Sequence, residues 1–220
     1  MTLVVAIDGP SGSGKSTVAR AVAAELGLEV LDTGAMYRAV TLAALDAGAS
    51  LSDEGACAAV ARASVITVEH GVTMLDGRDV SAEIRGPVVT GAVSTVSAHP
   101  AVREILVAHQ RGWVERHGGG VVEGRDIGTV VFPDATVKVF LDATDDERAR
   151  RRQRDEVAAS RAVAVDDVKA ALDRRDAIDS GRAVSPLRAA DDAILIDTTH
   201  LDVATVVADV VARARDREDA

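Results

Sequence analysis

The apolar residues of this chain alternate between short continuous runs and longer stretches with helical spacing. The short runs predict β-strands, because each is rich in Val, Ile or Leu and is bounded by polar or turn-forming residues. A run in which polar and apolar positions do not alternate is typical of a strand that is buried on both faces. The predicted strands are Leu3–Ile7, Glu29–Leu31, Val121–Glu123, Val137–Leu141 and Ala193–Asp197.

Stretches of helical spacing lie between these runs. In the first, Val18, Val22 and Leu26 recur every four residues, and Gly27 provides a typical C-cap. A second helix is predicted from about Gly34 to Ala47, with Asp32 and Thr33 as its caps, and residues 92–117 also have helical spacing. A capping box at Thr144 and Glu147 predicts the start of another helix, and a further helix contains Leu172. The last predicted helix is at the C-terminus, where one apolar stripe contains Val203, Val206, Val207, Val210 and Val211. Strands that alternate with helices predict an α/β fold, with a mostly parallel five-stranded sheet and helices on both faces.

Residues 57–91 break this alternation. Two apolar runs flank the turn residues His70-Gly71, and Asp76-Gly77 is a second turn signal. This pattern predicts a small antiparallel β insert at about 57–91. We therefore expect one domain, residues 1–220, that carries this insert as a lobe.

Composition and charge exclude several classes of protein. Of the 220 residues, 47% are hydrophobic and 27% charged, as in a globular protein and unlike a disordered or bilayer-spanning chain. The net charge of −10 disfavours a general nucleic-acid binder, because affinity for the phosphate backbone needs a basic surface. Cys57 is the single cysteine and the five histidines lack metal-ligand spacing, so neither a disulfide nor such a metal site is expected. The N-terminal apolar run is too short for a signal peptide or a membrane span, which predicts a cytoplasmic protein without a membrane partner.

A glycine-rich segment joins the first strand to the first helix. Gly9–Ser16 fits the pattern G-x-x-x-x-G-K-[ST], and a preceding strand and a following helix are the context that this pattern requires. The backbone N–H groups of such a loop hold phosphates, Lys15 supplies a charge for the β- and γ-phosphates, and the Ser16 hydroxyl can ligate Mg²⁺. A chance turn is the alternative, but pattern and context together favour an ATP site. The predicted ATP-binding residues are Gly9, Pro10, Ser11, Gly12, Ser13, Gly14, Lys15, Ser16 and Thr17.

Arginines concentrate in one predicted helix. Five of the seven positions from 148 to 154 are arginine. Such a run is often a solvated helix face or a nucleic-acid patch. Beside a phosphate loop in an acidic chain, it favours a lid at about residues 144–165 that places cations on the transferring phosphates.

Two further groups combine arginines with carboxylates. Arg175, Asp179 and Arg182 share one face if their helix continues through all three, although an ordinary surface ion pair would have the same spacing. Arg125 and Asp126 follow a strand at its carboxyl end, where ligands bind in open parallel sheets. An acceptor that is already a phosphate mainly needs its charge neutralised, so arginines that converge on one cleft suit a phosphate acceptor.

Several blocks of the sequence, taken in order, resemble the bacterial cytidylate kinase family. The resemblance runs from residue 3 to about residue 214, and the set of blocks is more specific than any one of them apart from the phosphate loop. The matching blocks are Ile7–Thr17, Leu31–Arg38, Asp79–Arg85, Pro100–Arg103, Glu123–Ala135 and Arg174–Leu187.

The resemblance implies a P-loop NTPase-type kinase that uses ATP and Mg²⁺ to phosphorylate CMP and dCMP. It also implies a monophosphate-binding lobe at about residues 34–105 and a lid. Glu123 stands where the family has Asp, and Arg150 enlarges the basic run of the lid. The implied CMP-binding residues are Thr33, Tyr37, Arg38, Ser94, Arg103, Arg125, Asp126, Arg175, Asp179 and Arg182. The predicted catalytic residues are Lys15, Arg125, Arg148, Arg152 and Arg182.

Cytosine chemistry agrees with this assignment. Its N4 amine is a donor beside the N3 and O2 acceptors, so a carboxylate such as Asp179 and a guanidinium such as Arg175 complement it. Uracil presents the opposite pattern at two of these positions and is expected to bind less tightly. A kinase for UMP or AMP, a nucleotide-gated binding module and an RNA-binding role for residues 148–154 remain the alternatives. We expect a monomer that binds small molecules and no nucleic acid.

Overall fold

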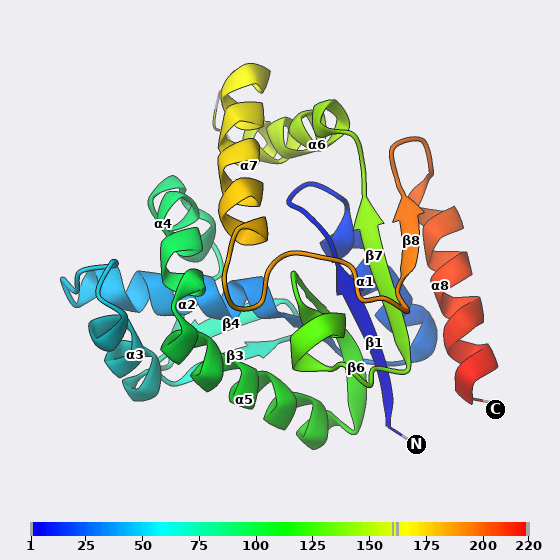
Figure 1. The fold of residues 1–220 in the computed structure, drawn as a ribbon, viewed down its shortest axis with the longest axis horizontal. Helices are drawn as coiled ribbons and strands as arrows, with labels where there is room; N and C mark the ends of the chain where they lie inside the picture. The colour runs from blue at the N-terminus through cyan, green and yellow to red at the C-terminus, as the bar shows by residue number, and fades with distance from the viewer. Residues whose placement is uncertain (1, 160, 162, 219–220) are drawn as a thin grey trace.

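The computed structural model describes residues 2–159, 161 and 163–218, and a parallel sheet forms the centre of this part of the chain (Figure 1). Its five strands have the order β2-β6-β1-β7-β8, and every neighbouring pair is parallel. The predicted α/β fold is therefore confirmed. The strands are β1 (Leu3–Asp8), β2 (Val30–Asp32), β6 (Gly119–Gly124), β7 (Val137–Asp142) and β8 (Ile194–Asp197).

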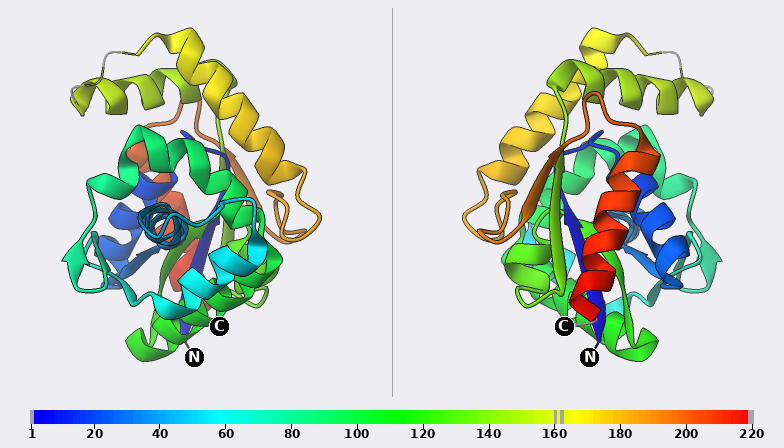
Figure 2. Two further views of the ribbon diagram at one scale, coloured as in Figure 1. Left: turned by 90° about the vertical axis from the view of Figure 1, so that its left-hand side faces the viewer. Right: turned by 90° about the vertical axis from the view of Figure 1, so that its right-hand side faces the viewer.

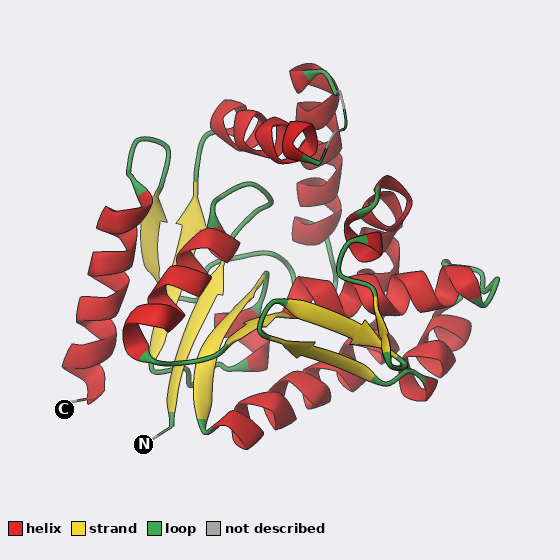
Figure 3. Cartoon of the chain, turned by 180° about the vertical axis from the view of Figure 1, so that it is seen from behind, coloured by secondary structure: helices red, strands yellow, loops and turns green. Residues whose placement is uncertain are grey.

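Helices cover both faces of the sheet (Figures 2 and 3). Leu3, Val5 and Ile7 of β1 pack with apolar residues of α1 and α8, whereas Val4 and Ala6 pack on the opposite side with α2 and α5. The continuous apolar run thus has a partner on each face, which explains why it lacks alternation. The helices are α1 (Lys15–Leu26), α2 (Thr33–Asp46), α3 (Glu54–Ala63), α4 (Pro87–Ala98), α5 (Pro100–His117), α6 (Asp145–Ala158), α7 (Val165–Ser180) and α8 (Val203–Glu218).

A second, antiparallel sheet lies beside α2. It consists of β3 (Ile66–Glu69), β4 (Val72–Leu75) and β5 (Arg78–Asp79). Asp76 and Gly77 both have positive φ, as a type I′ hairpin turn requires. The predicted insert at 57–91 is too wide, because its first residues belong to α3 and its last residues belong to α4.

Other differences from the predicted elements have local causes. The helical stretch 92–117 is two helices that meet at His99, because Pro100 favours an extended residue before it and starts α5. The predicted capping box at Thr144 is absent, since the Thr144 side chain makes no cap hydrogen bond. Val203 of the predicted apolar stripe is exposed, whereas the later valines of α8 are buried.

The helices α6 and α7 stand beyond the carboxyl ends of the strands (Figure 1). They pack on each other through a small cluster that contains Ala149, Val168 and Leu172. Residues 160 and 162 of the predicted lid lie outside the described residues. This placement brings the basic helix α6 against the loop that follows β1, since Arg148 donates to the Ser11 carbonyl oxygen.

Candidate active site

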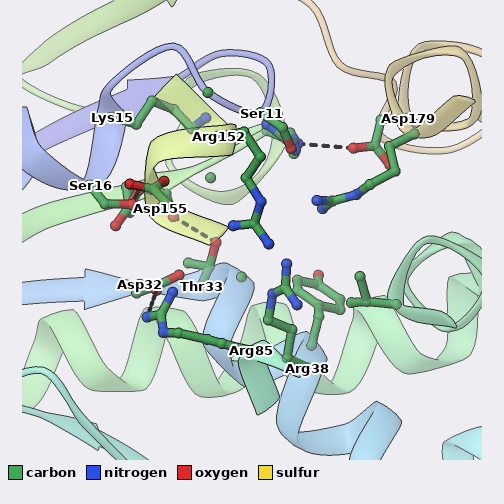
Figure 4. Close-up of a pocket in the computed structure, with 18 of the residues that line it drawn as sticks. Ser11, Lys15, Ser16, Asp32, Thr33, Arg38, Arg85, Arg152, Asp155 and Asp179 are labelled. Carbon is green, nitrogen blue, oxygen red and sulfur yellow. Dashed lines mark hydrogen bonds and ion pairs between the residues drawn. The ribbon is translucent and has the colours of Figure 1, made fainter. Parts of the chain in front are cut away.

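A cleft of about 850 Å³ opens at the carboxyl ends of β1, β2 and β6 (Figure 4). Its walls come from the phosphate loop, the start of α2, the helix α4, the loop after β6, and the helices α6 and α7. Ligands bind at this edge in open parallel sheets. The fold therefore brings the segments singled out in the sequence to one place.

The phosphate loop has a backbone that depends on its glycines. Gly9, Gly12 and Gly14 have φ values of 147°, 80° and 92°, which side-chain-bearing residues rarely adopt. A Cβ on Gly9 would also lie 2.0 Å from the Leu141 carbonyl oxygen. In the described structure, the Lys15 ammonium donates to the Pro10 carbonyl oxygen at 2.7 Å. Burial and the neighbouring Arg125 charge lower the pKa of Lys15, so an anion in the loop would stabilise its charged form.

A hydroxyl and a carboxylate meet at the start of α1. The Ser16 hydroxyl donates to Glu123 Oε2 at 2.8 Å, and Thr33 donates to the Glu123 carbonyl oxygen at 2.7 Å. Burial, followed by the nearby Asp32 charge, raises the pKa of Glu123. Oxygen donors of this kind suit Mg²⁺, which usually keeps several waters when it is bound with nucleotide phosphates. Glu123 thus lies within hydrogen-bond distance of the hydroxyl that the sequence predicts as a Mg²⁺ ligand.

Arg125 connects the phosphate loop to α7. Its Nε pairs with Asp179 at 2.9 Å, while its other nitrogens donate to the Gly9 carbonyl oxygen and the Ser11 hydroxyl. Arg182 pairs with the other carboxylate oxygen of Asp179. The helix α7 ends at Ser180, so Arg182 reaches Asp179 from the turn after the helix, not from a shared helix face as predicted.

A buried ion pair forms part of the cleft wall. Arg103 and Asp126 are 4% and 5% exposed at their side chains and are hydrogen-bonded to each other. The Arg103 guanidinium also lies 5.3 Å from the centre of the Tyr37 ring, within cation–π range. Each member of this group came from a different predicted segment, and the fold brings them together.

Arg38 and Arg175 form no ion pair within the described residues, yet both line the cleft. Burial and the nearby Arg175 charge lower the pKa of Arg38 to about 9. Burial and the nearby Arg125 charge lower the pKa of Arg175 to about 10. Ser94, also on the cleft wall, is buried with its hydroxyl unpartnered in the described structure. Such a cleft favours an anionic ligand that brings both charge and hydrogen-bond partners.

The two predicted lid arginines occupy different environments. Arg152 lines the cleft, as Figure 4 shows, and pairs with Glu156 at its edge. Arg148 does not line the cleft, because its buried guanidinium is bound by Asp145 and Asp176 and donates to the Ser11 carbonyl oxygen. In this conformation, Arg148 ties the helices to the phosphate loop and is not directed at the cleft.

Several cleft residues were not predicted as site residues. Arg151 and Arg154 belong to the basic run that suggested the lid, and Arg85 ends one of the matching blocks, so these signals were available in the sequence. Arg85 pairs with Asp32 at 3.0 Å across the cleft wall. The cleft residues that were missed include Arg20, Asp32, Arg85, Ser97, Arg151, Arg154, Asp155 and Arg161.

The remaining chemical groups add no second centre in the described part of the chain. Cys57 is buried among apolar residues of α3 and its neighbours, as a packing residue. Residues 2–159, 161 and 163–218 contain no cluster of three or more His, Cys, Asp or Glu suited to a metal ion. Among the described helices, none combines the length and the apolar character needed to span a bilayer.

Solved structures resemble this fold at low sequence identity. An uncharacterised protein from Eubacterium ventriosum has a TM-score of 0.56 at 12% identity, with 97% of this chain and 98% of that chain covered. A gluconokinase from Sinorhizobium meliloti has a TM-score of 0.52 at 14% identity, with 99% and 95% covered. Together with the sheet order, these similarities confirm the P-loop NTPase-type fold.

The sequence itself matches more specific relatives. A cytidylate kinase from Mycobacterium leprae is 51% identical over 218 residues, which are 99% of this chain and 98% of that protein. A cytidylate kinase from Rhodococcus opacus is 52% identical over 94% of this chain and 92% of its own. The family model described as Cytidylate kinase matches residues 5–216. The chain therefore belongs to the cytidylate kinase family.

Proposed function

We propose that this protein transfers the γ-phosphoryl group of ATP to the phosphate of CMP or dCMP. The observation that carries the site assignment is that the phosphate loop and a set of arginines from several separate elements line one cleft. A triphosphate and a monophosphate together bring a high negative charge, and such a reaction depends on positioning and charge neutralisation. The acceptor is already a phosphate, so no general base is assigned.

The donor end is formed by residues 9–17. Backbone N–H groups of the phosphate loop and the N-terminus of α1 hold the phosphates, and Lys15 neutralises the transferring group. Mg²⁺ supplies charge compensation between the ATP phosphates when it is bound. Ser16 would hold the ion directly, and Glu123, hydrogen-bonded to Ser16, would bind its water shell.

The acceptor end is formed on the other side of Arg125. We assign the CMP phosphate to Arg38, Arg125 and Arg182, with Arg103 as support, because these guanidinium groups come from separate elements and meet in or behind the cleft. Thr33, Tyr37, Ser94 and Asp126 complete the wall around the sugar and base. Asp179 would accept the cytosine amine while it orients two arginines, and Arg175 would donate to N3 or O2.

The larger units follow from this arrangement. We assign the monophosphate-binding lobe to about residues 34–105 and the lid to about residues 144–165. Arg152 lines the cleft and would face the transferring phosphates. We assign a monomeric, cytoplasmic protein that binds nucleotides as substrates and neither nucleic acid nor membrane as a partner.

A coupled assay of ADP formation across CMP, dCMP, UMP and AMP tests the proposal. We expect ADP release that depends on an added cytidine monophosphate and is at least tenfold slower with UMP or AMP. ADP release that is equally fast without any monophosphate would instead support a nucleotide-gated binding module. Equal rates with UMP would leave the kinase chemistry in place and refute the cytosine assignment.

A further inference from the structure

Asp8 is a buried carboxylate that the proposed mechanism does not use. It is the last residue of β1 and directly precedes the phosphate loop. It is 4% exposed and does not line the cleft. In the sheet register, Asp8 stands beside Gly124, the last residue of β6. Asp8 therefore lies between the start of the phosphate loop and the start of the loop that carries Arg125.

The Asp8 carboxylate binds two successive backbone amides. Oδ1 accepts from the Ile127 N–H and Oδ2 from the Gly128 N–H, each at 2.8 Å. These N–H groups begin the short helical turn Ile127–Val131, where the first donors lack partners within the turn. A carboxylate can accept one hydrogen bond on each oxygen. An asparagine of the same shape would accept one and point its amide N–H₂ at the other donor.

Holding an ionised carboxylate here costs folding free energy. Burial raises the pKa of Asp8 to about 6, although the two amide hydrogen bonds act in the opposite direction. A residue kept only for stability would be better replaced by a neutral one at such a position. The cost is consistent with a role for the carboxylate that neutral side chains do not supply.

The segment that Asp8 binds also carries the acceptor residues. Arg125 and Asp126 lie between Gly124 of β6 and the two bound amides of residues 127 and 128. Arg125 donates back to Gly9 and Ser11, which follow Asp8 in the chain. The loop after β6 is thus tied to the phosphate loop at two places, once through Arg125 and once through Asp8. Arg125 lines the cleft, whereas Asp8 does not, so the second tie is made outside the surface where we place the substrates.

We propose that Asp8 is a positioning residue: by binding the amides of Ile127 and Gly128, it fixes Arg125 and Asp126 at the distance from the phosphate loop that the two substrates require. Loss of one amide hydrogen bond would let the segment shift when Arg125 leaves Gly9 and Ser11 for a phosphate. Small misplacements of reacting groups cost up to about a hundredfold in rate. The effect should fall on kcat and on the KM for CMP more than on the KM for ATP.

The test compares Asp8→Asn with a matched control, Asp197→Asn. Asp197 is the last residue of the parallel strand β8, which pairs with β7, and it also accepts a backbone N–H, from Thr199 at 2.8 Å, but it does not line the cleft. We expect Asp8→Asn to lower kcat/KM for CMP by about tenfold or more with a KM for ATP within about twofold of wild type. Asp197→Asn should leave kcat/KM for CMP and the KM for ATP nearly unchanged. A wild-type kcat/KM in Asp8→Asn overturns the proposal.

A double-mutant cycle with Arg125→Ala tests whether Asp8 acts through Arg125. In that background, Asp8→Asn should cost less than about threefold, because the group that it positions is gone. If the double variant loses activity by the full product of the two single losses, Asp8 acts by another route and the proposal is overturned. Thermal unfolding of each variant identifies any loss that is due to unfolding alone.

The inference rests on the proposed function, and amide hydrogen exchange separates the two. Exchange at Ile127 and Gly128 should be faster in Asp8→Asn and unchanged in Asp197→Asn, whichever substrate the enzyme uses. If the wild-type protein is inactive with CMP and exchange is still faster in Asp8→Asn, the function is refuted and the tie made by Asp8 is retained. Unchanged exchange at both amides would refute the tie in a protein that phosphorylates CMP normally.

Discussion

Replacing Asp179 tests the part of the site that reads the base. Asp179 is 2% exposed, and its two carboxylate oxygens bind Arg125 and Arg182. If Asp179 also accepts the cytosine amine, Asp179→Ala removes a hydrogen bond that CMP can make and UMP cannot. A lost buried hydrogen-bond partner costs about 1–3 kcal/mol, so the preference for CMP over UMP should fall by about 5- to 150-fold.

The structure adds a second expected effect of the same change. Asp179→Ala leaves two buried guanidinium groups without their shared carboxylate, and breaking a buried ion pair costs about 3–5 kcal/mol. At about 2–4 °C per kcal/mol for a domain of this size, the melting temperature should fall by roughly 6–20 °C. CMP or inorganic phosphate should raise the melting temperature of Asp179→Ala more than it raises that of the wild type, because an anion supplies the missing charge.

The assay measures kcat/KM for CMP and UMP on both proteins below the melting temperature of the variant, with thermal unfolding in parallel. A variant that loses stability but keeps its CMP-to-UMP ratio would show that Asp179 only orients the arginines. Base selection would then be sought at Ser94 or elsewhere in the lobe. The conservative Asp179→Asn keeps an acceptor oxygen without the charge, so it should retain more of the CMP preference than Asp179→Ala while losing similar stability.

Three further predictions address the rest of the site. Lys15→Ala should lower turnover by at least about a hundredfold without unfolding the protein. Lys169 is half-buried and does not line the cleft, so Lys169→Ala should leave turnover unchanged; steady-state kinetics of the folded variants decides this. Arg152→Ala should lower kcat much more than it raises the KM for CMP, while Arg148→Ala should mainly lower the melting temperature. If Arg148→Ala instead lowers kcat and Arg152→Ala lowers only the melting temperature, the assignment of Arg152 to the cleft is contradicted. Folding raises the pKa of Asp8 from 3.8 to about 6, so the folded protein binds this proton more tightly than the unfolded chain does. The stability of the wild type relative to Asp8→Asn, measured by urea unfolding, should therefore fall by up to about 3 kcal/mol as the pH rises from 4 to 7. An increase in relative stability over this range would contradict the buried, ionisable environment of Asp8.

The parts of the fold that could be predicted are the parts that local sequence determines. The phosphate loop needs glycine at positions with positive φ, and the strand before it needs apolar residues on both faces. Both requirements leave a pattern within about ten residues. The hairpin turn at Asp76-Gly77 is of the same kind. Element boundaries were less certain, because proline and the neighbouring segments decide where a helix ends.

The contacts that build the site could not be predicted in the same way. Arg148 and Arg152 are separated by four residues and share a face of α6, yet Asp176 of α7 binds the first while the second reaches the cleft. The spacing alone gives both the same prediction. The Arg125–Asp179 pair joins positions that are 54 residues apart, and the Arg103–Asp126 pair joins positions 23 apart. Such pairs depend on how the segments pack, which leaves no periodic pattern in the sequence.

The five arginines assigned to CMP divide into two groups with different tasks. Arg103, Arg125 and Arg182 are paired with Asp126 or Asp179, so their places are set before any substrate binds. Preorganised charges of this kind need little rearrangement during the reaction. Arg38 and Arg175 have no carboxylate partner among the described residues, and the lowered pKa of each reflects burial and neighbouring positive charge. An anionic acceptor therefore relieves the repulsion at the second group while it contacts the first, so its binding stabilises both the charge and the geometry of the cleft.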